Sequence, residues 1–247
     1  MDTHISPAII MRVKEFGETD LLVTFFTRDR GQLKGVAKGA RKSRTRFVNA
    51  LDILSLVNLE YGLRREGALY FLHSGKLINA YPGLRSNFTS LSKASFMIEL
   101  TEALFPQGVV EPRMFELLKG AFERLDRGER LALIPMIFEA RAMVLGGYGI
   151  HLEKCCMCGR PYAGQGKAVF LRQMGCIACL GCKQPTATAP PMDPESVKAL
   201  SLMQSRSLLS AETLELTPES AREIKSVLRL HREYRLERRL KTSKYVE

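Results

Sequence analysis

Six cysteines restrict the folding of this chain more than any other feature, because all of them lie between Cys155 and Cys182. Cysteines in a small secreted domain usually form a framework of disulfides. Here they are crowded into one segment, and the first residues show neither a basic start nor the long apolar run of a signal peptide. No apolar stretch approaches the ~18 residues that cross a bilayer. We therefore expect a cytoplasmic protein with a metal site.

The spacing of these cysteines is that of a zinc ribbon, in which two Cys-x-x-Cys pairs direct four thiolates at one tetrahedral ion. Cys155 and Cys158 form the first pair. The second pair is ambiguous, since Cys176 with Cys179 and Cys179 with Cys182 both fit. A thioredoxin-like redox centre is the competing interpretation of a lone Cys-x-x-Cys, but it does not call for a second pair. The sequence therefore predicts one Zn²⁺ ion.

The predicted zinc has a structural role. Catalytic zinc normally has three protein ligands and an open position for water, and commonly uses His or a carboxylate. The nearest histidine, His151, lies outside the ligand spacing and is expected to be an ordinary imidazole, while Cys156 is a spare thiol. A zinc hydrolase or nuclease would need a His/Asp/Glu cluster that the sequence lacks. We expect the ion to hold a segment that is too poor in apolar residues to build its own core.

The charge of the chain points to a polyanionic partner. Lys and Arg number 37 against 26 Asp and Glu, which gives a net charge of +11. A soluble protein of high pI is the alternative interpretation of net charge alone. Eight basic residues nevertheless lie between Arg28 and Arg46, against Asp29 as the one acid, and a second cluster runs from Arg222 to Lys244. The candidate nucleic-acid ligands in the first cluster are Lys34, Lys38, Arg41, Lys42, Arg44 and Arg46. The glycines there lack the spacing of a nucleotide-binding P-loop, so nucleotide hydrolysis is not predicted.

Alternation of apolar and polar residues predicts five strands in the first ~80 residues. Without a helix for a parallel crossover, they fit a closed or partly closed antiparallel barrel of the OB type, with an SH3-like barrel as the alternative. The predicted strands are 9–14, 21–27, 32–37, 51–61 and 68–76.

The remainder of the chain shows helical spacing on both sides of the cysteines. Helical spacing of apolar residues predicts a helix over 88–104, and proline, capping and glycine signals predict helices from Pro112, over 131–145, from Pro194 and from Pro218. The fold class is therefore α+β and multidomain: an OB-type barrel at 1–80, a helical domain at 81–150, a zinc-binding insertion at 151–190, and C-terminal helices at 191–247 that pack on the helical domain.

Three segments carry a resemblance that extends over nearly the whole chain. They are RVKEFGETDLLVTFFTRDRGQLKGVAKGARKSRTRF, ALYFLHSGKLINAYPGLRSNF and GYGIHLEKCCMCG. Together they resemble the RecO family of DNA repair proteins. The first is similar to the opening strands of the family and its basic loop, the second to its last barrel strand and the entry into its helical domain, and the third to its zinc entry, Tyr-Gly-x-x-Leu-x-x-Cys-x-x-Cys-Gly.

The resemblance implies a particular set of zinc ligands. In the family pattern the second knuckle lies nine and twelve residues after a Phe and follows a Gly-Gly pair. Counted from Phe170, these positions are Cys179 and Cys182, while Cys176 stands where the second glycine would be. The implied ligands are Cys155, Cys158, Cys179 and Cys182.

The resemblance also implies a function without bond chemistry. A RecO-type recombination mediator binds single- and double-stranded DNA and anneals complementary strands. With RecR it helps to load RecA onto strands covered by single-strand-binding protein, while the engagement of RecF is left open. On this interpretation the basic candidates would neutralise phosphates, with little sequence preference.

Several assignments stay open. A zinc-ribbon transcription factor or ribosome-associated factor would share the basic loop and the thiolates. The C-terminal run of arginines is either a second DNA surface or the solvated face of a helix that turns Ile224, Val227 and Leu228 inward. Phe25, Phe26 and Phe47 could stack on bases, although core packing is favoured for at least one of the first two.

Overall fold

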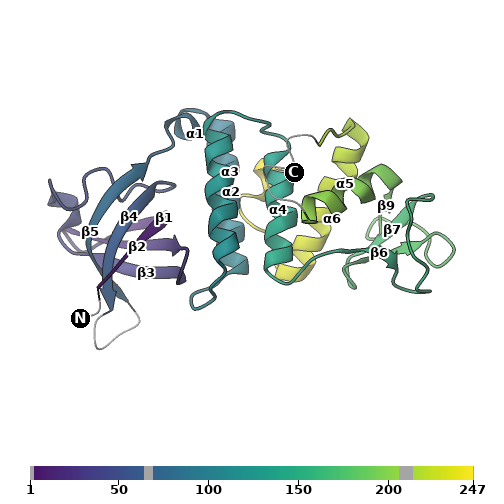
Figure 1. The fold of residues 1–247 in the computed structure, drawn as a ribbon, viewed down its shortest axis with the longest axis horizontal. Coiled ribbons are helices and arrows are strands. Elements are labelled where there is room, and N and C mark those ends of the chain that lie inside the picture. The colour runs from purple at the N-terminus through teal and green to yellow at the C-terminus, as the bar shows by residue number, and fades with distance from the viewer. Residues whose placement is uncertain (1–2, 64–68, 206–213, 247) are drawn as a thin grey trace. The chain divides into compact units, whose positions relative to one another are not determined.

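The computed structural model describes residues 3–63, 69–205 and 214–246 (Figure 1). The chain divides into two compact units. The first consists of Met1–Ala94 with Thr101–Gly128, and the second of Ser95–Leu100 with Glu129–Glu247. Within the described residues, no helix is both long enough and apolar enough to span a membrane.

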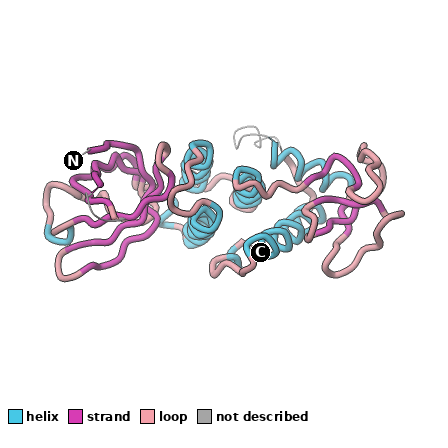
Figure 2. Tube along the Cα trace, turned by 90° about the horizontal axis from the view of Figure 1, so that it is seen from below, coloured by secondary structure: helices cyan, strands magenta, loops and turns pink. Residues whose placement is uncertain are grey.

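Five strands of the first unit form a closed barrel in the order β1-β2-β3-β5-β4, and Figure 2 shows them curving around a common interior. The neighbouring pairs are antiparallel except β3 with β5, which run parallel. The expectation of a fully antiparallel barrel is wrong at this seam, because strands in a closed ring can alternate in direction all the way round only when their number is even. The strands are β1 (Thr3–Phe16), β2 (Asp20–Thr27), β3 (Gly31–Ala37), β4 (Leu56–Leu63) and β5 (Tyr70–Asn79).

The barrel is filled by inward-pointing apolar side chains at alternate positions of its strands. Phe25 and Tyr61 meet edge to face at the centre, with ring centroids 5.3 Å apart. Phe47, on the segment between β3 and β4, belongs to the same core. Phe26 points outward and is covered by Phe105, with ring centroids 6.5 Å apart. All three phenylalanines proposed for base stacking are therefore buried, and that hypothesis is wrong for them.

The fourth strand is shorter than the sequence predicts, because it begins at Leu56 and not at residue 51. Asn49 and Leu54 adopt left-handed backbone conformations, which a strand does not accommodate. The Leu54 amide instead donates to the Ile10 carbonyl. Leu51 is nevertheless buried in the barrel core, so its apolar side chain gave the sequence pattern of a strand although the residue lies outside one. For the fifth strand, the predicted start at Ala68 lies outside the described residues.

Two helices of the first unit begin at the residues that the sequence predicts, Phe88 and Pro112. In the first unit α1 (Pro82–Ser86) is followed by α2 (Phe88–Leu104), which extends into the second unit, and by α3 (Pro112–Asp126). The Asn87 side chain caps α2 by accepting from the Ser90 amide. Tyr81, which follows β5, packs edge to face against Phe122 of α3, with ring centroids 5.7 Å apart. This contact connects the segment after the barrel to that helix.

In the second unit, the chain between Leu145 and Pro194 forms a small sheet (Figure 1). Its four strands are ordered β6-β8-β7-β9. As predicted, the later helices pack on α4. The helix predicted over 131–145 begins only at Ile134, because residues 131–133 form a turn that places Pro135 at the helix start. The elements are α4 (Ile134–Leu145), β6 (His151–Cys155), β7 (Ala168–Leu171), β8 (Cys176–Cys179), β9 (Pro191–Met192), α5 (Pro194–Ser205), α6 (Pro218–Leu236) and the short η3 (Ser243–Tyr245).

Candidate nucleic-acid interface and candidate metal centre

The residues from Lys38 to Arg46, called here the basic loop, follow β3 and include one turn of 3-10 helix, η1 (Ala40–Lys42). Gly39 takes the left-handed conformation that starts this turn. Its amide donates to Asp20 Oδ1 at 2.8 Å, and the Arg41 amide donates to the Thr19 carbonyl at 3.0 Å. The hydrogen bond from Gly39 holds the pKa of Asp20 below its ordinary value. The turn between β1 and β2 thus anchors the basic loop through its backbone.

All six predicted basic ligands are exposed on β3 and the basic loop. Arg41 pairs with Glu15 at 3.2 Å, so part of its charge is already balanced. Arg46 donates to the Lys38 carbonyl at 2.6 Å and lies over the Phe47 ring, 5.2 Å from its centroid. Among the described residues, Lys34, Lys42 and Arg44 have no acid within salt-bridge distance. The backbone of the basic loop is therefore fixed, while the charged ends of its Lys and Arg side chains remain in water.

Sequence reasoning missed Phe71 on β5. Its side chain is partly exposed, and Lys38 Nζ lies 5.4 Å from the ring centroid. The parallel pairing of β3 with β5 places Phe71 beside Val36. Alternation within the predicted last strand could have placed Phe71 on the outer face, but only the pairing brings it to the basic segment.

Four of the six cysteines come together in the second unit. The Sγ atoms of Cys155, Cys158, Cys179 and Cys182 all lie within 4.8 Å of one another. Cys155 and Cys179 close the strands β6 and β8, and the Cys179 amide donates to Cys155 Sγ at 3.3 Å. The Sγ atoms of Cys158 and Cys179 are 3.9 Å apart. A tetrahedral zinc with Zn–S bonds of about 2.3 Å separates its sulfur ligands by about 3.8 Å, so the donor set and its spacing fit Zn²⁺.

The thiols of this cluster differ in acidity. Burial alone would raise the pKa of Cys155, but hydrogen bonds from the backbone amides of Cys158, Cys179 and Met157 lower it to about 6. Hydrogen bonding with the Cys179 and Cys158 thiols raises the pKa of Cys182 to about 12. Neighbouring thiols oppose one another's ionisation, and a bound divalent cation would remove that opposition.

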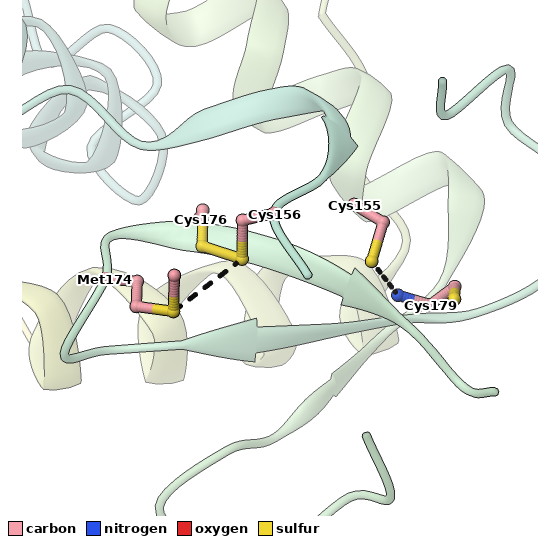
Figure 3. Close-up of a disulfide and its surroundings, with 5 residues drawn as sticks. All are labelled: Cys155, Cys156, Met174, Cys176 and Cys179. Atoms are coloured by element: carbon pink, nitrogen blue, oxygen red, sulfur yellow. Dashed lines mark hydrogen bonds between the residues drawn. A yellow bond between two sulfur atoms is a disulfide. The ribbon is translucent and has the colours of Figure 1, made fainter. Parts of the chain in front are cut away.

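The two remaining cysteines form a disulfide. Cys156 and Cys176 are joined with a Cα–Cα distance of 6.3 Å, and Cys156 Sγ also lies 4.0 Å from Met174 Sδ (Figure 3). Cys156 is therefore not the spare thiol that the sequence suggested. Cys176 begins β8 while Cys179 ends it, which separates the disulfide from the four-thiol cluster. His151 is exposed at the start of β6 and is not part of the cluster.

The C-terminal arginines do not form one exposed face. Arg232 is 1% exposed, donates to Glu139 at 2.7 Å and lies over the Phe96 ring. Arg229 and Arg239 both lie 3.8 Å from carboxylate oxygens of Glu233. The predicted apolar face of Ile224, Val227 and Leu228 is buried as expected. The interpretation of this run as a second DNA surface is wrong at Arg232, whose guanidinium is enclosed by its own unit.

Comparison with known proteins decides the family. The family model described as Recombination protein O N terminal matches residues 1–81, and that described as Recombination protein O C terminal matches residues 85–244. The chain belongs to the RecO family. The match to the N-terminal RecO model contains the whole barrel, and the match to the C-terminal model contains all six cysteines.

Similarity to individual RecO proteins extends over most of the chain. The protein named DNA repair protein RecO from Syntrophus aciditrophicus is 30% identical over 248 aligned residues, which cover 99% of this chain and 95% of the relative. The protein of the same name from Syntrophobacter fumaroxidans is 36% identical over 179 residues, 72% of this chain and 71% of the relative. The RecO of Geobacter metallireducens is 34% identical over 193 residues, 77% of each chain.

Proposed function

We propose that this chain is a DNA-binding recombination mediator that acts in DNA repair without catalysing a chemical reaction. The observation that carries the proposal is the set of six exposed cations on β3 and the basic loop of a closed barrel. The strand order β1-β2-β3-β5-β4 suits an OB-type barrel, a fold that binds oligonucleotides across its strands. Family membership and the names of the relatives support the role in repair.

The charge of the basic loop suggests how two complementary strands could be annealed. Each strand carries phosphates that repel those of the other, and cations held at the loop would neutralise both while releasing counterions. Contacts to phosphates position a strand without reading its sequence, so single- and double-stranded DNA of any sequence should bind. Annealing needs only this neutralisation and the approach of bases, and it requires no bond to be broken.

The other elements of the proposal follow from the family. RecR and single-strand-binding protein would be the protein partners, with RecA loading as the outcome and RecF engaged less directly. The cytoplasm, at the nucleoid, would be the location. One Zn²⁺ held by Cys155, Cys158, Cys179 and Cys182 would stabilise the second unit. The domain limits at 80, 150 and 190 are proposed as limits of function, with the barrel as the DNA-binding part.

The test reverses the charge of the basic loop. Lys38→Glu, Arg41→Glu and Lys42→Glu together should weaken binding to both single and double strands and abolish annealing. About four or five phosphate contacts on a single strand give a log-log salt slope on the order of −3, and the triple variant should bring it close to −1. Fluorescence anisotropy with a panel of oligonucleotide sequences at several salt concentrations measures both quantities.

A matched control changes the net charge equally at another place. Arg160, Lys183 and Lys198 are exposed in the second unit, and their reversal to Glu should leave affinity and slope nearly unchanged. Circular dichroism and zinc content show that both variants are folded. Unchanged affinity in a folded basic-loop variant would disprove the placement of DNA on this loop. A preference for one defined sequence, without annealing, would favour a zinc-ribbon transcription factor instead.

A further inference from the structure

The strand register of the barrel aligns four side chains in one row on its outer face. Lys14 pairs with Leu22, Leu22 with Val36, and Val36 with Phe71. Their neighbours in sequence point into the core, as Val13, Leu21, Ala37 and Leu72 show. Because successive side chains of a strand point to opposite faces, the row lies outside. It crosses β1, β2, β3 and β5 at about 4.8 Å a step.

The row ends in an aromatic ring among cations. The Phe71 side chain is partly exposed, whereas Val36 beside it is 6% exposed. Lys38 Nζ lies over the Phe71 ring at 5.4 Å from its centroid. Lys34 and Lys14 are exposed on the same outer face, Lys34 on β3 and Lys14 at the far end of the row. The exposed part of an aromatic side chain thus lies among positive charges.

We propose that Phe71 is the stacking platform for an unpaired base of single-stranded DNA, with Lys38 and Lys34 holding the phosphates on either side. The inference rests on the proposed function and adds a residue that distinguishes single-stranded from double-stranded DNA. A base stacks on an aromatic ring regardless of its identity, because every base has a π face. In a duplex both faces of a base are covered by its neighbours, so double-stranded DNA contacts only the cations.

The absence of tryptophan from the whole chain permits a direct measurement of stacking. Phe71→Trp introduces a single indole, whose fluorescence should be strongly quenched when a short oligothymidylate binds. The control is Phe88→Trp, because Phe88 is 73% exposed at the start of α2 and has no place in the row. Its fluorescence should change little at saturation. An abasic oligonucleotide of equal length should bind the Phe71→Trp variant with little quenching.

Affinity provides the second measurement. Phe71→Ala should weaken binding to single-stranded DNA about tenfold and leave binding to duplex within about twofold, since one stacked base contributes on that order. Phe71→Tyr should restore the affinity. Because Phe71 is paired with the buried Val36, Phe71→Leu serves as the variant that keeps apolar volume without a π face, and it should show the same selective loss. Circular dichroism verifies that each variant is folded.

The outcomes separate this inference from the proposed function. Equal quenching at positions 71 and 88, or equal loss on single and double strands, would overturn the stacking platform. If Phe71→Leu binds single strands normally while the triple reversal of the basic loop weakens binding, Phe71 is only an apolar neighbour of Val36 and the proposed function stands. If the triple reversal has no effect but Phe71→Leu selectively weakens single-strand binding, Phe71 stacks a base, whereas the phosphate contacts assigned to Lys38 and to the rest of the basic loop are wrong.

Discussion

The basic loop and the cysteine segment, residues 155–182, are anchored in different ways. The basic loop is tied to a barrel with its own apolar core, through hydrogen bonds to Asp20 and Thr19. The cysteine segment has strands of five residues at most, and its four thiols lie within 4.8 Å of one another. The basic loop is thus held by backbone anchors, whereas the cysteine segment gathers side chains that fit a shared metal ion.

The largest effect is expected from removal of zinc. If the basic loop and the cysteine segment responded alike, the proposed difference in their anchoring would be wrong. Cys155→Ser or Cys179→Ser should release about one equivalent of zinc and greatly speed amide exchange in the cysteine segment. Apparent binding free energies of structural zinc are on the order of 10 kcal/mol or more, so one lost thiolate should matter. Elemental analysis and hydrogen–deuterium exchange measure the two quantities, and exchange in the barrel should not change.

Two other cysteines provide the matched control. Cys156→Ser and Cys176→Ser remove the disulfide but none of the four clustered thiols, and should leave zinc bound. Loss of zinc from Cys176→Ser, together with retention in Cys182→Ser, would show that the second knuckle uses Cys176 and Cys179. Protein purified under reducing conditions without chelator that carries no zinc would refute the metal centre.

An intermediate effect should appear in mild acid. Burial lowers the pKa of His231 to about 4, and its Nε2 lies 2.6 Å from the Tyr148 carbonyl oxygen. Because the unfolded chain then binds the proton more readily, stability is full above about pH 6.5 and falls as the pH drops toward 4. The loss is up to about 3 kcal/mol. His231→Gln should flatten this part of the stability curve in urea titrations of zinc-loaded protein, whereas His4→Gln, in the barrel, should not.

The smallest effect sharpens the comparison at the basic loop. The pKa of Asp20 is lowered by the Gly39 amide, so its contribution is present above the unfolded value near 3.8 and is lost as the pH falls through the lower folded value. Asp20→Ala should speed exchange of the Gly39 amide at neutral pH and reduce DNA affinity only a few-fold. Nuclear magnetic resonance of that amide detects the change. An unaltered exchange rate would mean that the carboxylate does not anchor the loop.

Local patterns were sufficient for most of the fold. Helix starts at Asn87, Pro112 and Thr217 were predictable because a cap or a first-turn proline acts within a few residues. The same local signals misplaced the start of β4, since burial of Leu51 in a turn looks identical in sequence to burial in a strand. Helix and strand boundaries that depend on tertiary contacts cannot be predicted from such local patterns.

The residues of the candidate sites also divide into those that local sequence predicts and those that depend on tertiary contacts. Clustering of charge located the basic loop, and spacing together with resemblance named four cysteines that the structure brings together. The disulfide between Cys156 and Cys176 depends on where β8 lies beside the chain after β6, which spacing does not encode. The stacking candidates were misjudged because Phe25 alternates inward, and Phe71 gains its cation only through the pairing of β3 with β5.

The parallel seam between β3 and β5 also has a consequence for the order of folding. Its described register consists of two residue pairs, Gly35 with Tyr70 and Val36 with Phe71. The two strands that they join are far apart in sequence. Contacts between distant segments form late, because the loop between them must first be closed. A nascent chain whose β1, β2 and β3 have paired would already display its lysines and attract DNA. It would lack the ring beneath Lys38 until the seam closed, so discrimination between single and double strands would mature after the first attraction to DNA.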